Sequence, residues 1–134
     1  MKIAYASRTG NVESIVAQLD MESVRIDSGN ETLAEDYVLF TYTDGYGDVP
    51  AEVEAFLAGN AMFLKGVVVS GDTGYGEAYC LAGDKIAEEH DVECLYKVEN
   101  AGTPEDIAAI KENVDTLVII PNDRLLLVVG KGTS

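Results

Sequence analysis

Apolar runs of strand length alternate along the chain with segments whose apolar residues recur at helical spacing. The runs resemble buried strands bounded by Gly, Asn, Asp or Ser, and they cover 2–6, 23–26, 37–42, 66–71 and 92–98. Apolar positions three or four residues apart predict helices over 11–19, 50–58, 77–89 and 103–117. The pattern therefore predicts strands that alternate with helices, except that no helical segment separates 23–26 from 37–42.

Alternation of this kind predicts the architecture, because a helix that connects two strands brings them back parallel and covers one face of the sheet. We expect an α/β fold, a three-layer sandwich with a five-stranded parallel sheet and helices on both faces. No repeat or linker interrupts the pattern, so we expect one domain over 1–134 with its core in 1–117. A second apolar run, Leu125 to Val129, follows a turn in the tail 118–134. It predicts either an extra edge strand or a contact with an oligomer or partner.

Three of the helix starts carry recognisable signals. Asn11 is placed to cap the first helix, and Pro50 suits the first turn of the second. Thr103 followed by Pro104 predicts a cap and a first helical residue for the last helix.

The charge excludes some classes of partner. Nine Lys and Arg against 24 Asp and Glu leave a formal charge of −15, which repels nucleic-acid phosphates and anionic lipid. The surplus favours basic partners or cations, and a high-salt habitat explains it equally well. No signal peptide is recognisable, and Cys80 and Cys94 are too few for a disulfide framework. We expect a cytoplasmic protein with reduced thiols and no membrane association.

Three polar, glycine-bearing loops follow predicted strands. They begin at Ser7, Thr43 and Asp72. In an open parallel sheet, ligands bind beyond the carboxyl ends of the strands where the strand order reverses, and one common order is 2-1-3-4-5. In that order the three loops are neighbours, so we expect them to form one crevice.

The first loop, Ser7 to Asn11, has the composition of a phosphate cradle. It offers two hydroxyls, an amide side chain and successive backbone N–H groups that lead into a helix. It lacks the Lys-Ser/Thr ending of a P-loop and the GxGxxG spacing of a dinucleotide site, which favours a terminal monophosphate. The alternative is a βα turn with a structural role only.

The second and third loops each carry a tyrosine beside glycines, Tyr46 and Tyr75. Two such rings could sandwich a flat ring system while the glycines allow close backbone approach. Gly45 can adopt a positive φ and present a peptide whose orientation changes with the redox state of the bound ring. The alternatives are two half-buried anchors and a plain turn.

Several motifs resemble known families. Ser7 to Asn11 resembles the FMN phosphate loop of flavodoxins, and GDTGYGEAYCLAGD (71–84), LYKVE (95–99) and GTPED (102–106) resemble NrdI, the flavodoxin-like activator family of class Ib ribonucleotide reductase. The resemblance implies a flavodoxin-like fold with FMN bound at the three loops. It assigns the cofactor to Ser7, Arg8, Thr9, Gly10, Asn11, Val12, Thr43, Asp44, Gly45, Tyr46, Gly47, Ser70, Gly71, Asp72, Thr73, Gly74, Tyr75, Gly76 and Glu77.

The same resemblance implies a reaction. Reduced FMN reacts with dioxygen, and the superoxide formed serves to assemble the dimanganese–tyrosyl radical cofactor of the partner, the small subunit of class Ib ribonucleotide reductase. A flavin reductase of unknown identity would supply the electrons. The alternative is a short-chain flavodoxin that only transfers electrons. A receiver-type phospho-switch would need an acidic pair after the first strand, where Ala6, Ser7 and Arg8 stand.

The third loop departs from the usual family pattern, S-G-N-x-N-aromatic-G, because Asp72 and Gly74 replace the two asparagines. An ionised carboxylate only accepts hydrogen bonds, and glycine has no side chain to offer. Other candidate chemistry is sparse. Cys80 and Cys94 are typical of buried thiols, with a redox pair as the alternative, and His90 stands near a helix C-terminus. We therefore expect no metal site on this chain.

Overall fold

The computed structural model describes residues 1–119. The expectations for the tail 118–134 fall outside this part, except that residues 118 and 119 belong to the last helix. Among the helices that the structure describes, none combines the length and hydropathy needed to span a membrane.

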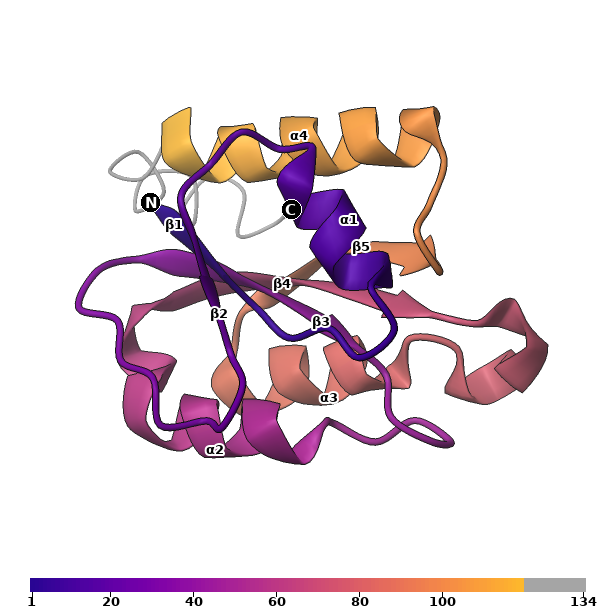
Figure 1. Cartoon of the computed structure of the whole chain (residues 1–134), viewed down its shortest axis with the longest axis horizontal. Helices are drawn as coiled ribbons and strands as arrows, with labels where there is room; N and C mark the ends of the chain where they lie inside the picture. The colour runs from indigo at the N-terminus through magenta and orange to yellow at the C-terminus, as the bar shows by residue number, and fades with distance from the viewer. Residues whose placement is uncertain (120–134) are drawn as a thin grey trace.

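A five-stranded sheet forms the centre of the fold (Figure 1). Its strands are β1 (Lys2–Tyr5), β2 (Ser23–Arg25), β3 (Tyr37–Tyr42), β4 (Leu64–Gly71) and β5 (Glu93–Glu99). The order across the sheet is β2-β1-β3-β4-β5, and every neighbouring pair is parallel. The predicted fold class is therefore confirmed.

The helices cover the sheet on both faces, with α1 and α4 on one side and α2 and α3 on the other (Figure 1). The described helices are α1 (Asn11–Ala17), α2 (Ala51–Asn60), α3 (Leu81–His90) and α4 (Pro104–Ile119), together with the short 3₁₀ helices η1 (Ala61–Phe63) and η2 (Thr73–Ala78). Because both sheet faces are covered, the central strands are apolar at consecutive positions rather than at alternate ones.

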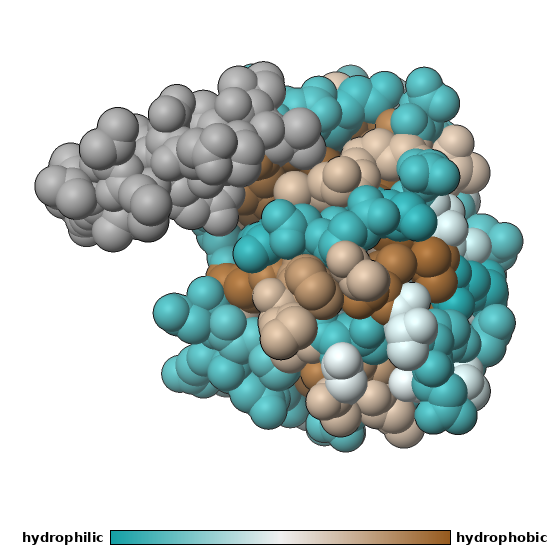
Figure 2. Space-filling model, turned by 90° about the vertical axis from the view of Figure 1, so that its left-hand side faces the viewer, coloured by the Kyte–Doolittle hydropathy of each residue, from teal (hydrophilic) through white to brown (hydrophobic). Residues whose placement is uncertain are grey.

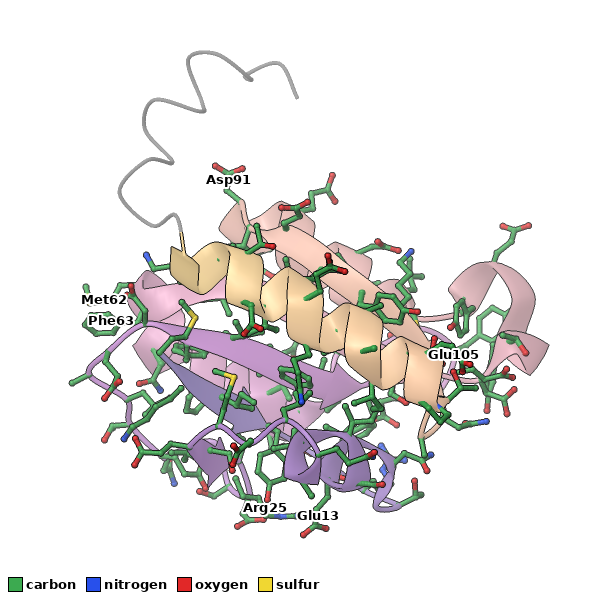
Figure 3. All side chains as sticks on the ribbon, turned by 90° about the horizontal axis from the view of Figure 1, so that it is seen from above. Glu13, Arg25, Met62, Phe63, Asp91 and Glu105 are labelled. Atoms are coloured by element: carbon green, nitrogen blue, oxygen red, sulfur yellow. The ribbon has the colours of Figure 1, made fainter. Side chains whose placement is uncertain are left out.

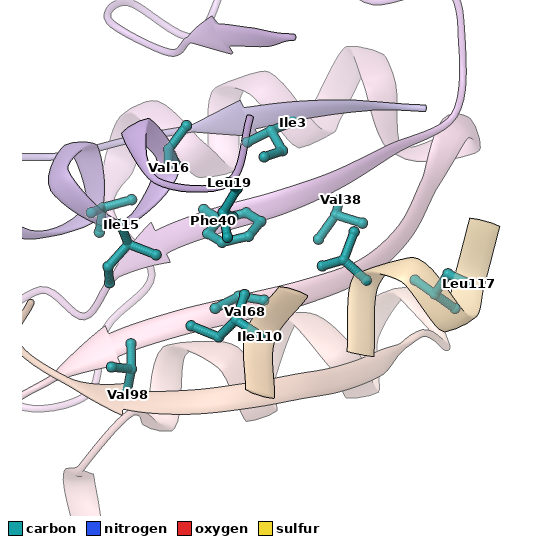
Figure 4. Close-up of a cluster of buried hydrophobic side chains, with 12 residues drawn as sticks. Ile3, Ile15, Val16, Leu19, Val38, Phe40, Val68, Val98, Ile110 and Leu117 are labelled. Atoms are coloured by element: carbon teal, nitrogen blue, oxygen red, sulfur yellow. The ribbon is translucent and has the colours of Figure 1, made fainter. Parts of the chain in front are cut away.

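Two large apolar clusters and a small third one fill the spaces between sheet and helices. Alternate strand residues point to opposite faces, so Phe40 packs on the α1 and α4 side while Leu39 packs on the α2 and α3 side. Figure 4 shows the first cluster, in which Ile15 of α1 and Ile110 of α4 meet the sheet. These side chains are at most 1% exposed. Each one stabilises the fold by about 1.5–3 kcal/mol.

The first helix is capped differently from the sequence expectation. Asn11 was expected as the cap, but it is the first helical residue and Gly10 precedes it with φ 96°. The Ser7 hydroxyl accepts the Glu13 N–H at 3.2 Å, and the Gly10 carbonyl accepts the Ser14 N–H at 3.0 Å. Because Gly10 takes the cap position and Asn11 is already helical, the Asn11 side chain is not the cap.

Two other helix starts are also clear. Pro50 stands at the cap position of α2, one residue before the expected first turn. Thr103 caps α4 as expected. Its hydroxyl accepts the Asp106 N–H at 3.1 Å, and the Asp106 carboxylate accepts the Thr103 N–H at 2.9 Å. The Tyr96 hydroxyl donates to the same carboxylate at 2.6 Å, and these bonds lower the pKa of Asp106.

The prediction of a helix over 77–89 is wrong at its start, because α3 begins only at Leu81. Gly76 has φ 56° and ψ −118°, and Cys80 has φ 55°. These conformations break the chain into η2 and α3, because neither belongs to a right-handed helix. The break turns the chain back over the carboxyl end of β4.

Apolar surface gathers at the end of the sheet where the strands begin, opposite to the carboxyl end of β4. Figure 2 views that end, where brown surface shows between hydrophilic side chains. Met62 lies there, in η1 just before β4, and is 78% exposed. The candidate site lies at the opposite end of the strands and does not include this residue.

We expect Gly83→Ala to destabilise the fold by about 1–3 kcal/mol. A Cβ at Gly83 would lie 2.4 Å from Val69 Cγ1 and 3.2 Å from Cys94 Sγ, so α3 would have to move away from β4. The control is Gly59→Ala in α2, where a Cβ meets nothing within 4 Å. That change should be neutral or stabilising by up to about 1 kcal/mol. Urea unfolding followed by circular dichroism measures both, and equal effects would contradict the tight packing of α3.

Candidate functional site

A crevice lies at the carboxyl ends of the strands. Its walls come from the loops after β1, β3, β4 and β5 and from the residues around the start of α3. The lining residues are Arg8, Thr9, Asn11, Tyr42, Thr43, Gly45, Ser70, Gly71, Asp72, Tyr75, Ala78, Cys80 and Asn100. The three loops expected from the sequence therefore meet, and the loop after β5 joins them.

The loop after β1 presents unused backbone donors. Within residues 1–119, the N–H groups of Thr9, Gly10, Asn11 and Val12 have no hydrogen-bond acceptor. Four successive unpaired amides favour an anionic ligand. Arg25 of β2 supports the loop from behind, because its Nη2 donates to the Ser7 carbonyl at 2.8 Å. Figure 3 shows Arg25 beside Glu13 of α1, and the ion pair between them measures 3.4 Å.

Arg8 links this loop to the loop after β3. Its Nη2 donates to Asp44 Oδ1 at 2.5 Å, and its guanidinium lies 4.6 Å from the centre of the Tyr42 ring. The bond to Asp44 is the main cause that raises the pKa of Arg8 above its ordinary value. Arg8 is the one basic side chain among the residues that line the crevice, so it supplies the positive charge next to the unpaired amides.

The loop after β3 is a tight hairpin. The N–H groups of Asp44 and Asp48 each donate to the other residue's carbonyl, at 2.8 and 2.7 Å. Gly45 has φ 51° and Gly47 has φ 106°. At Gly47 glycine is also needed for space, because a Cβ would lie 2.8 Å from Leu81 Cδ2. The turn therefore holds Gly45 at the crevice in the left-handed conformation that the sequence suggested.

Tyr46 and Tyr75 meet each other at the mouth of the crevice. Their ring centres are 5.9 Å apart and the rings are inclined by 69°. A flat ring between two parallel tyrosines needs about 7 Å, twice the contact distance of carbon atoms. Tyr46 is 71% exposed and Tyr75 46%, so solvent surrounds much of both rings. The expected sandwich therefore requires the two rings to separate.

The floor of the crevice is made of hydrogen-bonded strand ends. The Thr43 hydroxyl donates to the Ser70 carbonyl at 3.1 Å, and the Ser70 hydroxyl donates to the Asn100 carbonyl at 2.8 Å. The buried Cys80 thiol donates to the Val69 carbonyl at 3.5 Å. Burial raises the pKa of Cys80 to about 11, which keeps it protonated at neutral pH. Cys80 and Cys94 are both free thiols.

Relatives of the chain identify its family. The family described as NrdI Flavodoxin like matches residues 3–112, which include all three loops. A protein NrdI from Bacillus licheniformis is 36% identical over 118 residues, which are 88% of this chain and 90% of that protein. The chain belongs to the NrdI family. Proteins of this flavodoxin-like family bind FMN, so the chain has an FMN-binding role.

Two solved structures share the fold. A short-chain flavodoxin associated with a non-canonical PDU bacterial microcompartment superposes with a TM-score of 0.67 at 22% identity, over 87% of this chain and 95% of that one. The two-electron reduced flavodoxin of Megasphaera elsdenii superposes with a TM-score of 0.59 at 19% identity, over 85% and 98%. At these identities the likeness concerns the fold alone.

The crevice suits the cofactor of the NrdI family. The unpaired amides of residues 9–12 and the guanidinium of Arg8 match a phosphate group. The exposed tyrosines of the second and third loops match a ring system that enters between them. The residues present therefore fit FMN.

The residues expected from the sequence fall into two groups. Some line the crevice: Arg8, Thr9, Asn11, Thr43, Gly45, Ser70, Gly71, Asp72 and Tyr75. Others belong to the same loops without lining it: Ser7, Gly10, Val12, Asp44, Tyr46, Gly47, Thr73, Gly74, Gly76 and Glu77.

Four lining residues were missed: Tyr42, Ala78, Cys80 and Asn100. Asn100 carries a signal that was available, because it directly follows the last strand and so belongs to the same edge of the sheet. The other three have no comparable signal. They reach the crevice because of the break between η2 and α3 and the end of β3.

The two unusual residues of the third loop are bonded to each other. Asp72 Oδ1 accepts the Gly74 N–H at 2.8 Å, and the Asp72 carbonyl accepts the Tyr75 N–H at 3.1 Å. A Cβ at position 74 would lie 3.1 Å from Asp72 Oδ1, so glycine lets the carboxylate approach. The carboxylate in this way holds the turn that presents Tyr75.

We expect Asp72→Ala to speed hydrogen exchange at the Gly74 amide about fivefold, because the change removes a hydrogen bond that contributes about 1 kcal/mol. Asp72→Asn keeps an acceptor oxygen and should leave the exchange near its parent rate. Exchange measured by nuclear magnetic resonance tests the pair. An Asp72→Ala protein with parental exchange at Gly74 would show that the carboxylate does not hold the turn.

Proposed function

We propose that this protein is an FMN-dependent activator of class Ib ribonucleotide reductase. In this function its reduced cofactor delivers one electron to dioxygen, and the superoxide formed assembles the dimanganese–tyrosyl radical cofactor of the reductase's small subunit. A flavin reductase of unidentified type returns the electrons. The main support is membership of the NrdI family together with a crevice whose residues fit FMN.

The loop after β1 would bind the phosphate. Ser7, already engaged with the Glu13 N–H, fixes the loop, while the amides of residues 9–12 have no partner among the described residues and Thr9 and Asn11 line the crevice. Arg8 would add charge, although Asp44 competes with a phosphate for its guanidinium. Charge-assisted hydrogen bonds contribute about 1.5–3 kcal/mol each, so this loop would supply much of the affinity.

The second and third loops would hold the ring system. Bound FMN supplies one-electron and two-electron redox chemistry that no side chain of the protein offers. Tyr46 and Tyr75 would pack against it from the two loops, and Gly45 would present a peptide at its edge. The exposure of both tyrosines leaves the mouth open to dioxygen and to a docked partner. The excess of acidic residues favours a partner with a basic docking face.

We expect Gly45→Ala to change a midpoint potential of the bound flavin. A left-handed conformation costs alanine about 1–2 kcal/mol, and a Cβ at Gly45 meets only Asp48 Oδ2, at 3.9 Å. If one redox state of the flavin depends more on this conformation than the other, the midpoint potential of the one-electron step that forms it shifts by up to about 40–90 mV. Stepwise reduction followed by visible spectroscopy measures the potentials, with Gly59→Ala as control. Unchanged potentials would remove Gly45 from the redox chemistry.

The activator function predicts a radical in the partner. The reduced FMN-loaded protein, mixed with its cognate small subunit, Mn²⁺ and air, should generate a tyrosyl radical that electron paramagnetic resonance detects. Hydrogen peroxide without this protein should not. Added salt should slow the reaction, because it screens attraction between an acidic protein and a basic face beyond about 10 Å at 0.1 M.

The controls omit this protein or use its FMN-free form. A preparation that holds FMN and gives no radical above these controls contradicts the activator function. Electron transfer to a protein acceptor by that same preparation would then support a plain flavodoxin.

A further inference from the structure

We propose that Asn100, in the loop after β5, is a flavin-recognition residue whose carboxamide binds the imide edge of the FMN ring. This inference rests on the proposed FMN site and adds a fourth loop to it. The imide of the ring, an N–H between two carbonyls, is matched by a carboxamide, which offers one acceptor and one donor group.

The backbone of Asn100 is fixed against the crevice. Its N–H donates to the Gly71 carbonyl at 2.8 Å, and its carbonyl accepts the Ser70 hydroxyl at 2.8 Å. Its φ is 53°, a conformation that asparagine tolerates better than most residues. The main-chain groups are therefore occupied by the end of β4, and the side chain lines the crevice.

The carboxamide of Asn100 is unused, unlike the polar groups around it. Within residues 1–119 its side-chain atoms make no hydrogen bond. The Ser70 hydroxyl donates to Asn100, and Asp72 Oδ1 accepts from Gly74. The Thr73 hydroxyl donates to Glu99. Among the described residues that line the crevice near the ends of β4 and β5, two side chains keep a polar hydrogen that is not bonded. They are the hydroxyl of Tyr75 and the carboxamide of Asn100.

The position of Asn100 along the sheet also fits. The phosphate loop follows β1 and Asn100 follows β5, and β3 and β4 lie between them. Three inter-strand spacings place the two strand ends about 14 Å apart. FMN carries its phosphate at one end of a ribityl chain and its ring system at the other. If the loop after β1 binds the phosphate, the ring system therefore lies toward the ends of β4 and β5.

The third loop has no carboxamide of its own. In that loop Asp72 is bonded to the Gly74 N–H, and Gly74 has no side chain. Neither can donate a side-chain hydrogen bond to the ring. Asn100, one strand further along the sheet, provides the carboxamide that the third loop lacks.

The test compares FMN with its N3-methyl derivative, which lacks the imide N–H. Asn100→Gly removes the carboxamide and tolerates the positive φ. We expect the parent protein to bind FMN about 3- to 10-fold more tightly than the N3-methyl derivative, and Asn100→Gly to bind both alike. Affinity for FMN itself should fall by a similar factor. Fluorescence titration of the FMN-free proteins measures all four dissociation constants.

Asp91→Gly is the matched control, because Asp91 also has a positive φ, 55°. It follows α3, and Figure 3 shows it far from Glu105, which follows the Asn100 loop at the start of α4. This variant should keep the parent's affinities and its preference for FMN. Asn100→Gly with the parent's preference would overturn the inference while leaving FMN binding intact. A parent protein that binds no FMN would overturn the proposed function as well.

Discussion

The fold depends on one constraint, that a parallel sheet must bury both of its faces. The helices α1, α2 and α3 connect parallel strands, and α4 follows the last strand. Together they supply the apolar layers, with α1 and α4 on one face and α2 and α3 on the other. Parallel strands also end at the same edge. Polar residues excluded from two buried faces therefore collect where β1, β3, β4 and β5 end, and the crevice forms there.

Backbone conformation at that edge is unusual for the same reason. Chains that leave parallel strands must turn sharply to enter a helix, and positive φ values gather at these turns: Gly10, Gly45, Gly47, Gly76, Cys80, Asn100 and Gly102. At such turns, backbone amides can remain without a hydrogen-bond acceptor in the protein. The amides of residues 9–12 are the clearest case, and they give an acidic protein a place for an anion without many basic side chains.

Hydrogen bonds and an ion pair within the loops offset the acidic charge at this edge of the sheet. Arg8 is paired with Asp44 across the crevice, and Asp72 holds the turn of the third loop through the Gly74 amide. Both carboxylates are therefore bonded to loop residues. In the proposed FMN site, the loop after β5 would add the carboxamide of Asn100 to this edge.

The sequence by itself determined the strand and helix alternation, the parallel sheet and three of the four loops of the crevice, because apolar periodicity and glycine-rich turns are local signals. It also determined the family, through the motifs between Gly71 and Asp106. Only the tertiary structure decided that Gly10 rather than Asn11 is the cap residue of α1, that the chain breaks at Cys80, and that Tyr46 and Tyr75 touch. Each of these depends on contacts or backbone angles set by packing between elements, which no local pattern records.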